Sequence, residues 1–410
     1  MFKKEKLENG VTLLTENMTE VKSISLGIFV KSGSIYENSS NNGVSHLIEH
    51  LVFKGSKKRT AKQIAEEMDL IGGQVNAFSS KEFTCYYARV TQNHIKDAVD
   101  ILTDIVLNPI FDIKDFNKEK NIVIEEIKMY EDSPEEYIHD LLPLEMIKEG
   151  SLKLPILGTP KSLENLTIDN IKEYFNNLYV PENIFISVSG KFDRELVKNM
   201  ILESIPAKKE KSLINPLSGI SSFNSGKKII KKEIEQSHLL IGFPGISQID
   251  EKRYAFNMLN SILAGSMSSR VFQKVREEMG VAYSTFSYMI NFMDGGMYAV
   301  YAACDPKNIF STQNAIWNEI EKIKNSGITK KELEIAKNQY ISSIYLGQES
   351  TYNRMIRMAK YDYYFGEQLS LEKITSLVEK VTENQIQNLA KDFLKKENSF
   401  TLILGKMEDI

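Results

Sequence analysis

The sequence feature that most constrains the fold is a pattern that recurs after about 215 residues. Gly27 and Gly242 each lie in an apolar run, and Gly190 and Gly405 each close one; both pairs are 215 positions apart. Amphipathic segments around residues 171 and 386 share this offset, and segments 116–120 and 333–337 match at 217. Since several matches agree on nearly one offset, we predict two homologous halves of about 200 residues each.

Each half is expected to be α+β, with a largely antiparallel sheet packed with helices. In the first half, apolar runs and alternation predict strands, and three-to-four-residue periodicity predicts helices. We expect strands at 11–15, 24–30, 74–78, 84–90 and 184–188, and helices at 44–53, 60–70, 95–107, 114–130 and 168–178. Residues 208–226 have little periodicity and contain Pro216, Gly219 and Gly226. We therefore predict an N-terminal half at 1–210, a linker at 211–226 and a C-terminal half at 227–410.

Composition excludes several classes of protein. The 410 residues carry a formal net charge of -4, and no concentrated basic patch suggests a nucleic-acid partner. No apolar run is long enough to cross a membrane, and the N-terminal segment does not resemble a signal peptide. The two cysteines, Cys85 and Cys304, do not suggest a disulfide framework, and we interpret Cys85 as a small buried hydrophobe. These features favour a cytoplasmic protein.

The segment His46-Leu47-Ile48-Glu49-His50 has the spacing of a metal site. In a helix, His46 and His50 project from one face, and Glu49 reaches the edge of that face. Two imidazoles so placed can bind Zn²⁺, and a nearby carboxylate can take a proton from a water that the metal activates. The order His-x-x-Glu-His is the signature of inverted zincins. The alternative is a pair of hydrogen-bonded core histidines.

Catalytic zinc usually has three protein ligands, so a further ligand is expected. The helix predicted at 114–130 offers Glu119 and Glu126, which are two turns apart on one face, whereas Glu125 points away. The second half lacks such a set, because the positions equivalent to His46, Glu49 and His50 hold Ser261, Ala264 and Gly265. Metal chemistry is therefore assigned to the first half.

Taken together, these motifs resemble the M16 (insulinase/pitrilysin) metallopeptidases, and the length resembles the branch of the mitochondrial processing peptidase and its bacterial relatives. The resemblance covers essentially the whole chain. It rests on the His-x-x-Glu-His motif at 46–50, here called the zinc motif, and on Glu126, which follows His50 by 76 residues. Further matching stretches lie at 72–78, 119–126, 269–276 and 280–283.

The resemblance implies a role for each residue of the site. His46, His50 and Glu126 would bind one Zn²⁺ per chain, Glu49 would be the general base, and Glu119 would orient a ligand. Two homologous halves would close like a clam around a peptide, which is the processing-peptidase-like metallohydrolase fold.

Two further sets of residues are implied with more than one interpretation. Arg276 and Tyr283 match a pair that stabilises the reacting carbonyl in the family, although a surface Arg and a core Tyr would look the same in sequence. Asn76, Ala77 and Phe78 would bind substrate by pairing an extended peptide to an edge strand, or they form a purely structural strand.

The hypothesis from sequence is a zinc endopeptidase that cleaves unfolded or extended peptides. Glu49 would take a proton from water and pass it to the leaving amine. The resemblance suggests a homodimer, with a heterodimer beside a metal-free homologue as a further option. A non-catalytic or partner-dependent peptide-binding subunit of the same fold is the alternative.

Overall fold

The computed structural model describes residues 2–207, 220 and 222–406. The chain forms two compact units, each assembled from three segments. Unit 1 comprises Met1–Lys128, Leu154–Ser218 and Leu346–Gln368, and unit 2 comprises Met129–Lys153, Gly219–Tyr345 and Leu369–Ile410. Each unit therefore contains one segment from the opposite half of the sequence. The boundaries predicted from sequence, 1–210 and 227–410, do not include this exchange of segments between the halves. The division of the sequence into two halves at these positions stays a prediction.

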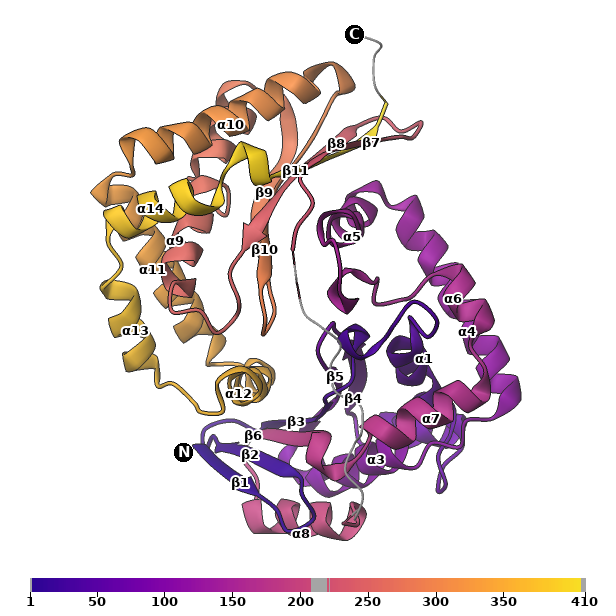
Figure 1. Cartoon of the computed structure of the whole chain (residues 1–410). Helices are drawn as coiled ribbons and strands as arrows, with labels where there is room; N and C mark the ends of the chain where they lie inside the picture. Colours follow the sequence, from indigo (N-terminus) through magenta and orange to yellow (C-terminus); the bar gives the residue numbers. More distant parts are fainter. Residues whose placement is uncertain (1, 208–219, 221, 407–410) are drawn as a thin grey trace. The chain divides into compact units, whose positions relative to one another are not determined.

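Unit 1 is built on a six-stranded sheet with the order β1-β2-β6-β3-β5-β4 (Figure 1). Only β2 and β6 run parallel, so the predicted antiparallel character is confirmed. The strands are β1 (Phe2–Lys6), β2 (Thr12–Asn17), β3 (Ser23–Val30), β4 (Gln74–Ser79), β5 (Thr84–Thr91) and β6 (Ile184–Gly190). Every strand expected in this half is present, and β1 is an additional one that the charged N-terminal sequence did not suggest.

Helices cover both faces of the unit 1 sheet. Helix α3 packs on β3 and β5, while α12 packs on β2, β3 and β6 from the other face (Figure 1). The helices are α1 (Val44–Leu51), continued by the 3₁₀ turn η2 (Val52–Lys54), α2 (Ala61–Leu70), α3 (Ile95–Leu107), most of α4 (Ile113–Asp132), α6 (Pro160–Asn165), α7 (Ile168–Leu178), α8 (Arg194–Ser204) and α12 (Thr351–Phe365).

The exchanged helix α12 completes the core of unit 1. Its Met355 and Met358 join a buried cluster with Phe29 and Cys85, which confirms Cys85 as a buried hydrophobe. Polar atoms on this sheet face are satisfied as well, because the Ser187 hydroxyl donates to the Met355 carbonyl at 2.8 Å. Burial of α12 therefore supplies both apolar contact and hydrogen bonds.

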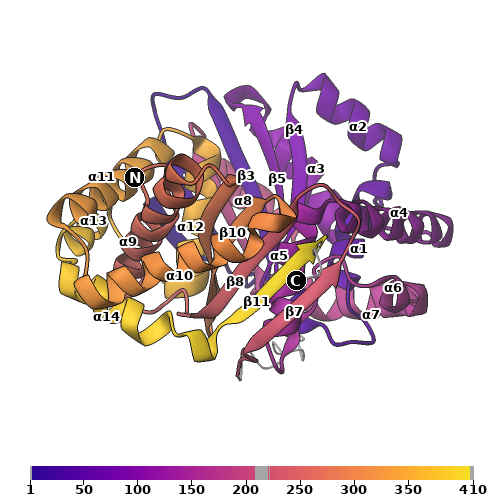
Figure 2. The ribbon, with the colours of Figure 1, turned by 90° about the horizontal axis from the view of Figure 1, so that it is seen from above.

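Unit 2 repeats this plan with the order β7-β11-β8-β10-β9, in which only β7 and β11 are parallel. Its strands are β7 (Gly226–Lys231), β8 (Ser237–Gly245), β9 (Ala282–Asn291), β10 (Gly296–Cys304) and β11 (Phe400–Gly405). Figure 2 shows α10 and α14 beside this sheet. The helices are α5 (Pro134–Met146), α9 (Arg253–Leu263), the π-helical η6 (Phe272–Glu278), α10 (Ile309–Ser326), α11 (Lys330–Gly347, mostly in unit 2), α13 (Leu371–Glu379) and α14 (Glu383–Phe393).

The exchanged helix of unit 2 is α5, which packs on β8 and β11. Gly242 of β8 allows this approach, since a Cβ there would lie 2.5 Å from Cδ1 of Leu142 and 3.0 Å from Sδ of Met146. Gly27 of β3 plays the same part in unit 1, where a Cβ would lie 2.9 Å from Sδ of Met355. The two glycines that revealed the repeat are thus the positions at which each sheet receives its exchanged helix.

Other parts of the predicted repeat are confirmed by the structure. Gly190 and Gly405 close equivalent strands with positive φ values of 130° and 141°. Lys120 donates to the carbonyl of Glu164, and Lys337 donates to that of Glu379, at the ends of equivalent helices. Helices α7 and α14 both begin with a threonine capping box. The halves therefore share strand order, helix positions and local contacts.

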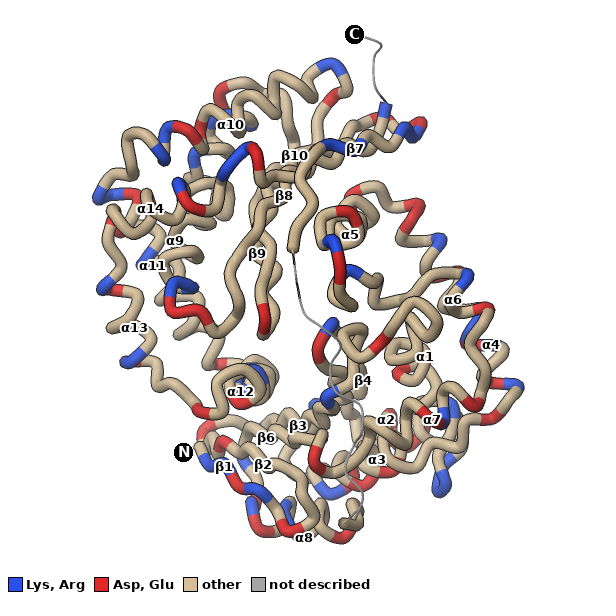
Figure 3. The backbone as a smooth tube through the Cα atoms, in the orientation of Figure 1, with Lys and Arg blue, Asp and Glu red and all other residues tan. Residues whose placement is uncertain are grey.

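Most of the predicted linker falls on residues 211–219 and 221, which lie outside the described residues. Of the remainder, Phe223 forms a β-bridge with Ile147, and the Asn224 N–H donates to the Met146 carbonyl at 2.8 Å. In the described ranges, no helix combines the length and the hydropathy that a membrane span requires. Figure 3 shows basic and acidic residues interspersed along the outer helices of each unit.

Candidate metal centre

Helix α1 carries the zinc motif, and a buried carboxylate holds its N-terminus. Glu37 is fully buried and accepts hydrogen bonds from the backbone N–H of Gly43 at 2.8 Å and of Ser45 at 2.9 Å. Its Oε2 also accepts from Nδ2 of Asn42 at 2.9 Å. A carboxylate at this end satisfies free N–H groups and favours the helix dipole. The start and direction of α1 are therefore fixed from one side.

His46, His50 and Glu126 converge in unit 1. Among the described residues they are the one group of three His, Cys, Asp or Glu whose donor atoms all lie within 4.8 Å of one another. Oε2 of Glu126 is 3.9 Å from Nε2 of His46 and 3.7 Å from Nε2 of His50. Glu126 comes from α4, and Glu125 beside it is exposed and pairs with Lys128. The face assigned to each glutamate from sequence is confirmed.

This donor set fits zinc. The separations of 3.7 and 3.9 Å are too long for hydrogen bonds and close to the ~3.3 Å between ligands that share a tetrahedral ion at about 2.0–2.1 Å. Burial, with a smaller contribution from His50, lowers the pKa of His46 to about 3, so its imidazole is neutral at physiological pH. Neutral imidazole is the form that binds metals. Nδ1 of His46 is buried without a hydrogen-bond partner among the described residues, and Nδ1 of His50 contacts Glu119, so the two rings are not a hydrogen-bonded pair through these atoms.

Glu49 lies beside this cluster and contacts the edge strand β4. The Ser79 hydroxyl donates to Oε2 of Glu49 at 2.5 Å. Burial raises the pKa of Glu49 despite this hydrogen bond, which moves the carboxyl toward the range in which it can both accept and release protons. Ser79 was missed in the sequence, although it directly follows the predicted substrate stretch. Asn76, Ala77 and Phe78 do lie on an edge strand, as expected, while substrate binding by them stays a prediction.

Glu119 lies on the other side of His50. Its Oε2 accepts from Nδ1–H of His50 at 3.2 Å, since a carboxylate can only accept. Its Oε1 forms an ion pair with Nζ of Lys54 at 2.9 Å, although the angle is not that of a hydrogen bond. The side chain of Glu119 is only 2% exposed. Glu119 therefore contacts the predicted ligand His50, while its role in orienting that ligand stays a prediction. Lys54 is a contact that the sequence did not suggest.

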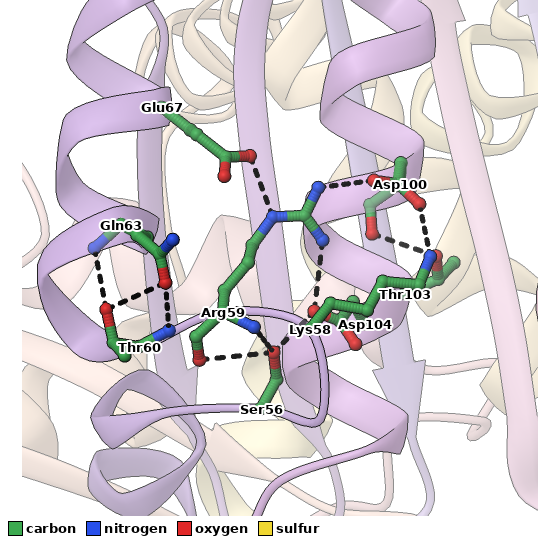
Figure 4. A network of polar contacts seen from close by, with 9 residues as sticks. All are labelled: Ser56, Lys58, Arg59, Thr60, Gln63, Glu67, Asp100, Thr103 and Asp104. Atoms are coloured by element: carbon green, nitrogen blue, oxygen red, sulfur yellow. Dashed lines mark hydrogen bonds and ion pairs between the residues drawn. The ribbon is translucent and has the colours of Figure 1, made fainter.

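A polar network centred on Arg59 anchors the segment that follows Lys54 (Figure 4). Arg59 donates from Nε to Glu67 at 2.7 Å, from Nη1 to Asp104 at 3.0 Å and from Nη2 to Asp100. Ser56 also donates to Asp104, which is buried. Because these partners come from α2 and α3, the network fixes the end of the zinc-motif segment to two helices.

Arg276 and Tyr283 are neighbours in unit 2. The guanidinium of Arg276 lies 5.1 Å from the ring centre of Tyr283 and 4.9 Å from that of Phe272. Tyr283 is 78% exposed, which excludes the interpretation of a core tyrosine. Their assigned role at the metal cluster, which lies in unit 1, stays a prediction.

The chain belongs to the insulinase family of peptidases, family M16. The family model for insulinase (peptidase family M16) matches residues 12–160, and the model for the peptidase M16 inactive domain matches residues 165–340. The second match agrees with the absence of metal ligands from the positions equivalent to the zinc motif.

Among curated relatives, the uncharacterized zinc protease YmxG of Bacillus subtilis (strain 168) is 39% identical over 406 residues, covering 98% of each chain. The uncharacterized zinc protease SCO5738 of Streptomyces coelicolor is 34% identical, covering 98% of this chain and 89% of the relative. A crystal structure of a protease from Helicobacter pylori has a TM-score of 0.92 at 20% identity, covering 99% of both chains. That structure of a distant relative supports the α+β fold alone.

Proposed function

We propose that the protein is a zinc-dependent endopeptidase that cleaves extended peptides. The observation that carries this proposal is the convergence of two imidazoles and a carboxylate beside a second, hydrogen-bonded carboxylate, Glu49. The names of the curated relatives support zinc protease chemistry at the level of the class. The mechanism and the substrate are inferred from the site.

His46, His50 and Glu126 would hold the ion, at one per chain. Zinc bound there would supply Lewis-acid chemistry that makes water nucleophilic near neutral pH. Glu49 takes the proton from the attacking water and delivers it to the leaving amine. Ser79 keeps the Glu49 carboxylate turned toward β4 through its hydrogen bond. Arg276 and Tyr283 are proposed to stabilise the reacting carbonyl, as the family resemblance implies.

The edge strand β4 supports the preference for extended substrates. It pairs with β5 on one side only, so its other edge can accept a peptide through main-chain hydrogen bonds. Because Ser79 ends this strand and bonds to Glu49, a peptide paired along Asn76, Ala77 and Phe78 would run toward the general base. Most backbone groups of a folded protein are already hydrogen-bonded, so an extended segment is the form of substrate that pairs most readily in this way.

The decisive experiment combines zinc content with cleavage of a quenched fluorescent peptide. We expect about one zinc per chain and activity in the wild type, with both largely lost in Glu126→Gln. Glu49→Gln should retain zinc and lose activity about 10²–10⁴-fold, because proton transfer is removed. Glu125→Gln is the matched control, since this neighbouring carboxylate is exposed, and it should leave both quantities unchanged. Near wild-type cleavage by Glu49→Gln would refute the assigned base.

Zinc binding without cleavage would support the alternative of a peptide-binding or partner-dependent subunit. We also propose a homodimer and a cytoplasmic location. The homodimer rests on family resemblance, and the location is consistent with two buried free cysteines. Sedimentation of the purified chain tests the homodimer, and a monomer at micromolar concentration would contradict it.

A further inference from the structure

Lys54 lies one helical turn beyond the second histidine of the zinc motif. The 3₁₀ turn η2 continues α1 without a break, so His50 and Lys54, four residues apart, project from nearly the same side. Glu119 reaches in from α4 and contacts both residues. One carboxylate oxygen is 3.2 Å from Nδ1 of His50, and the other is 2.9 Å from Nζ of Lys54.

The charge of Glu119 requires a partner because its side chain is almost completely buried. A buried carboxylate without compensation is strongly destabilising. His50 contacts Glu119 through one hydrogen bond, which leaves the other carboxylate oxygen for a different partner. In the described part of the chain, Lys54 is the only lysine or arginine within ion-pair distance of Glu119. Its own side chain is 34% exposed, so the ammonium remains partly hydrated while it pairs.

Lys54 is itself held in place. Gly55 follows it with a φ of 138°, which ends the helical turn, and the Arg59 network fixes the next residues to α2 and α3. The ammonium is thus presented to Glu119 by an anchored backbone, in contrast to the mobile lysines of an open surface.

We propose that Lys54 is a positioning residue for the metal centre. Its ammonium holds one oxygen of Glu119, which leaves the other oxygen directed at Nδ1 of His50 and keeps Nε2 of His50 directed toward Glu126. This inference rests on the proposed zinc site. Residues that orient a metal ligand in this way typically change metal affinity about 10–100-fold when they are replaced.

The test is zinc affinity of the full chain, measured by competition with a chromogenic chelator. We expect Lys54→Met to bind zinc about tenfold more weakly and Glu119→Gln about 10–100-fold more weakly. The double variant should match Glu119→Gln within about twofold, because Lys54 acts through Glu119. Lys54→Arg keeps the charge and should recover most of the affinity. Lys58→Met is the control, since Lys58 pairs with Asp100 instead.

Wild-type affinity in Lys54→Met would overturn the proposal, and so would a loss that is undiminished in the Glu119→Gln background. Circular dichroism of each variant separates these outcomes from misfolding, and failure of both Lys54→Met and Lys54→Arg to fold would assign Lys54 a structural role. Absence of zinc binding by the wild type would overturn the zinc site and this inference together. Normal wild-type binding with no effect of Lys54→Met would overturn this inference alone.

Discussion

Substitution of Gly242 by alanine tests how α5 docks on the unit 2 sheet. The backbone of Gly242 is not in the left-handed region, so alanine is sterically acceptable to the strand itself. Its Cβ, however, would lie 2.5 Å from Cδ1 of Leu142 and 3.0 Å from Sδ of Met146. These distances force the α5 side chains, or the helix, to move.

The expected cost follows from which atoms collide. Overpacking a core typically costs about 1–3 kcal/mol. Here the colliding atoms are the ends of flexible side chains, which can move aside. A Gly→Ala change also reduces the conformational entropy of the unfolded chain, which stabilises the folded state by about 0.4–1 kcal/mol and offsets part of this cost. We therefore expect Gly242→Ala to destabilise unit 2 by about 1–2 kcal/mol. Leu142→Ala alone should cost about 2–5 kcal/mol, because Leu142 is fully buried.

The two changes should compensate each other, since the methyl group introduced by Gly242→Ala fills part of the space that Leu142 leaves. We expect a coupling energy of at least about 1 kcal/mol in a double-mutant cycle. Trp317, the single tryptophan, packs against Phe243 in unit 2 at a ring separation of 5.6 Å. Its fluorescence during urea unfolding reports this unit. A neutral Gly242→Ala, or strictly additive costs, would refute the proposed close packing of α5 over Gly242.

Two further predictions concern buried polar groups. Arg59→Met should destabilise unit 1 by about 3 kcal/mol, because it leaves the buried Asp104 without its cation. Hydrogen exchange in α2 and α3 should become faster in this variant. The exposed control Lys58→Met should cost below about 1 kcal/mol, and equal effects of the two substitutions would contradict the anchoring role of Arg59. In unit 2, burial and then His238 lower the pKa of His139 to about 4, and burial lowers the pKa of His238. Unfolded histidines have a pKa near 6.5, so these two groups bind protons more readily in the unfolded chain than in the folded one. The free energy of unfolding should therefore be unaffected above about pH 6.5 and should fall as the pH drops toward 4. The decrease is at most about 1.4 kcal/mol per pH unit for each histidine. Urea unfolding followed by Trp317 fluorescence at several pH values measures this slope, which should be smaller in His139→Phe; an unchanged slope would exclude His139.

Much of the metal cluster could be predicted because it depends on local spacing. His46 and His50 lie on one helix, and Glu119 and Glu126 lie on another, so helical periodicity alone places each pair on a face. The contacts of Ser79 with Glu49 and of Lys54 with Glu119 join elements distant in sequence. No local pattern marks such pairs. A lysine four residues after the second histidine was a usable signal for Lys54 only once Glu119 was known to lie beside it.

The fold was predictable for similar reasons, and its main gap has a physical cause. Helical periodicity located α2, α3 and α7, while the repeat predicted two sheets of one kind. Helix α5 was missed because Pro143 lies inside it and its sequence has a weak apolar stripe. The exchange of α5 and α12 between the halves is a property of tertiary packing. Gly27 and Gly242 were the sequence signal for this exchange, because a strand position without a side chain lets a helix pack closely against the sheet.

The exchanged helices determine what would happen if the chain were divided into two proteins. A break in the 208–219 segment would give two fragments, each lacking the helix that covers one face of its own sheet. Fragment 1–207 would keep α5 without the sheet on which it packs, and the C-terminal fragment would keep α12 in the same condition. Each fragment would expose an apolar surface that a helix of the other fragment covers in the intact chain. Co-expressed halves should therefore reassociate, and either half produced alone should aggregate.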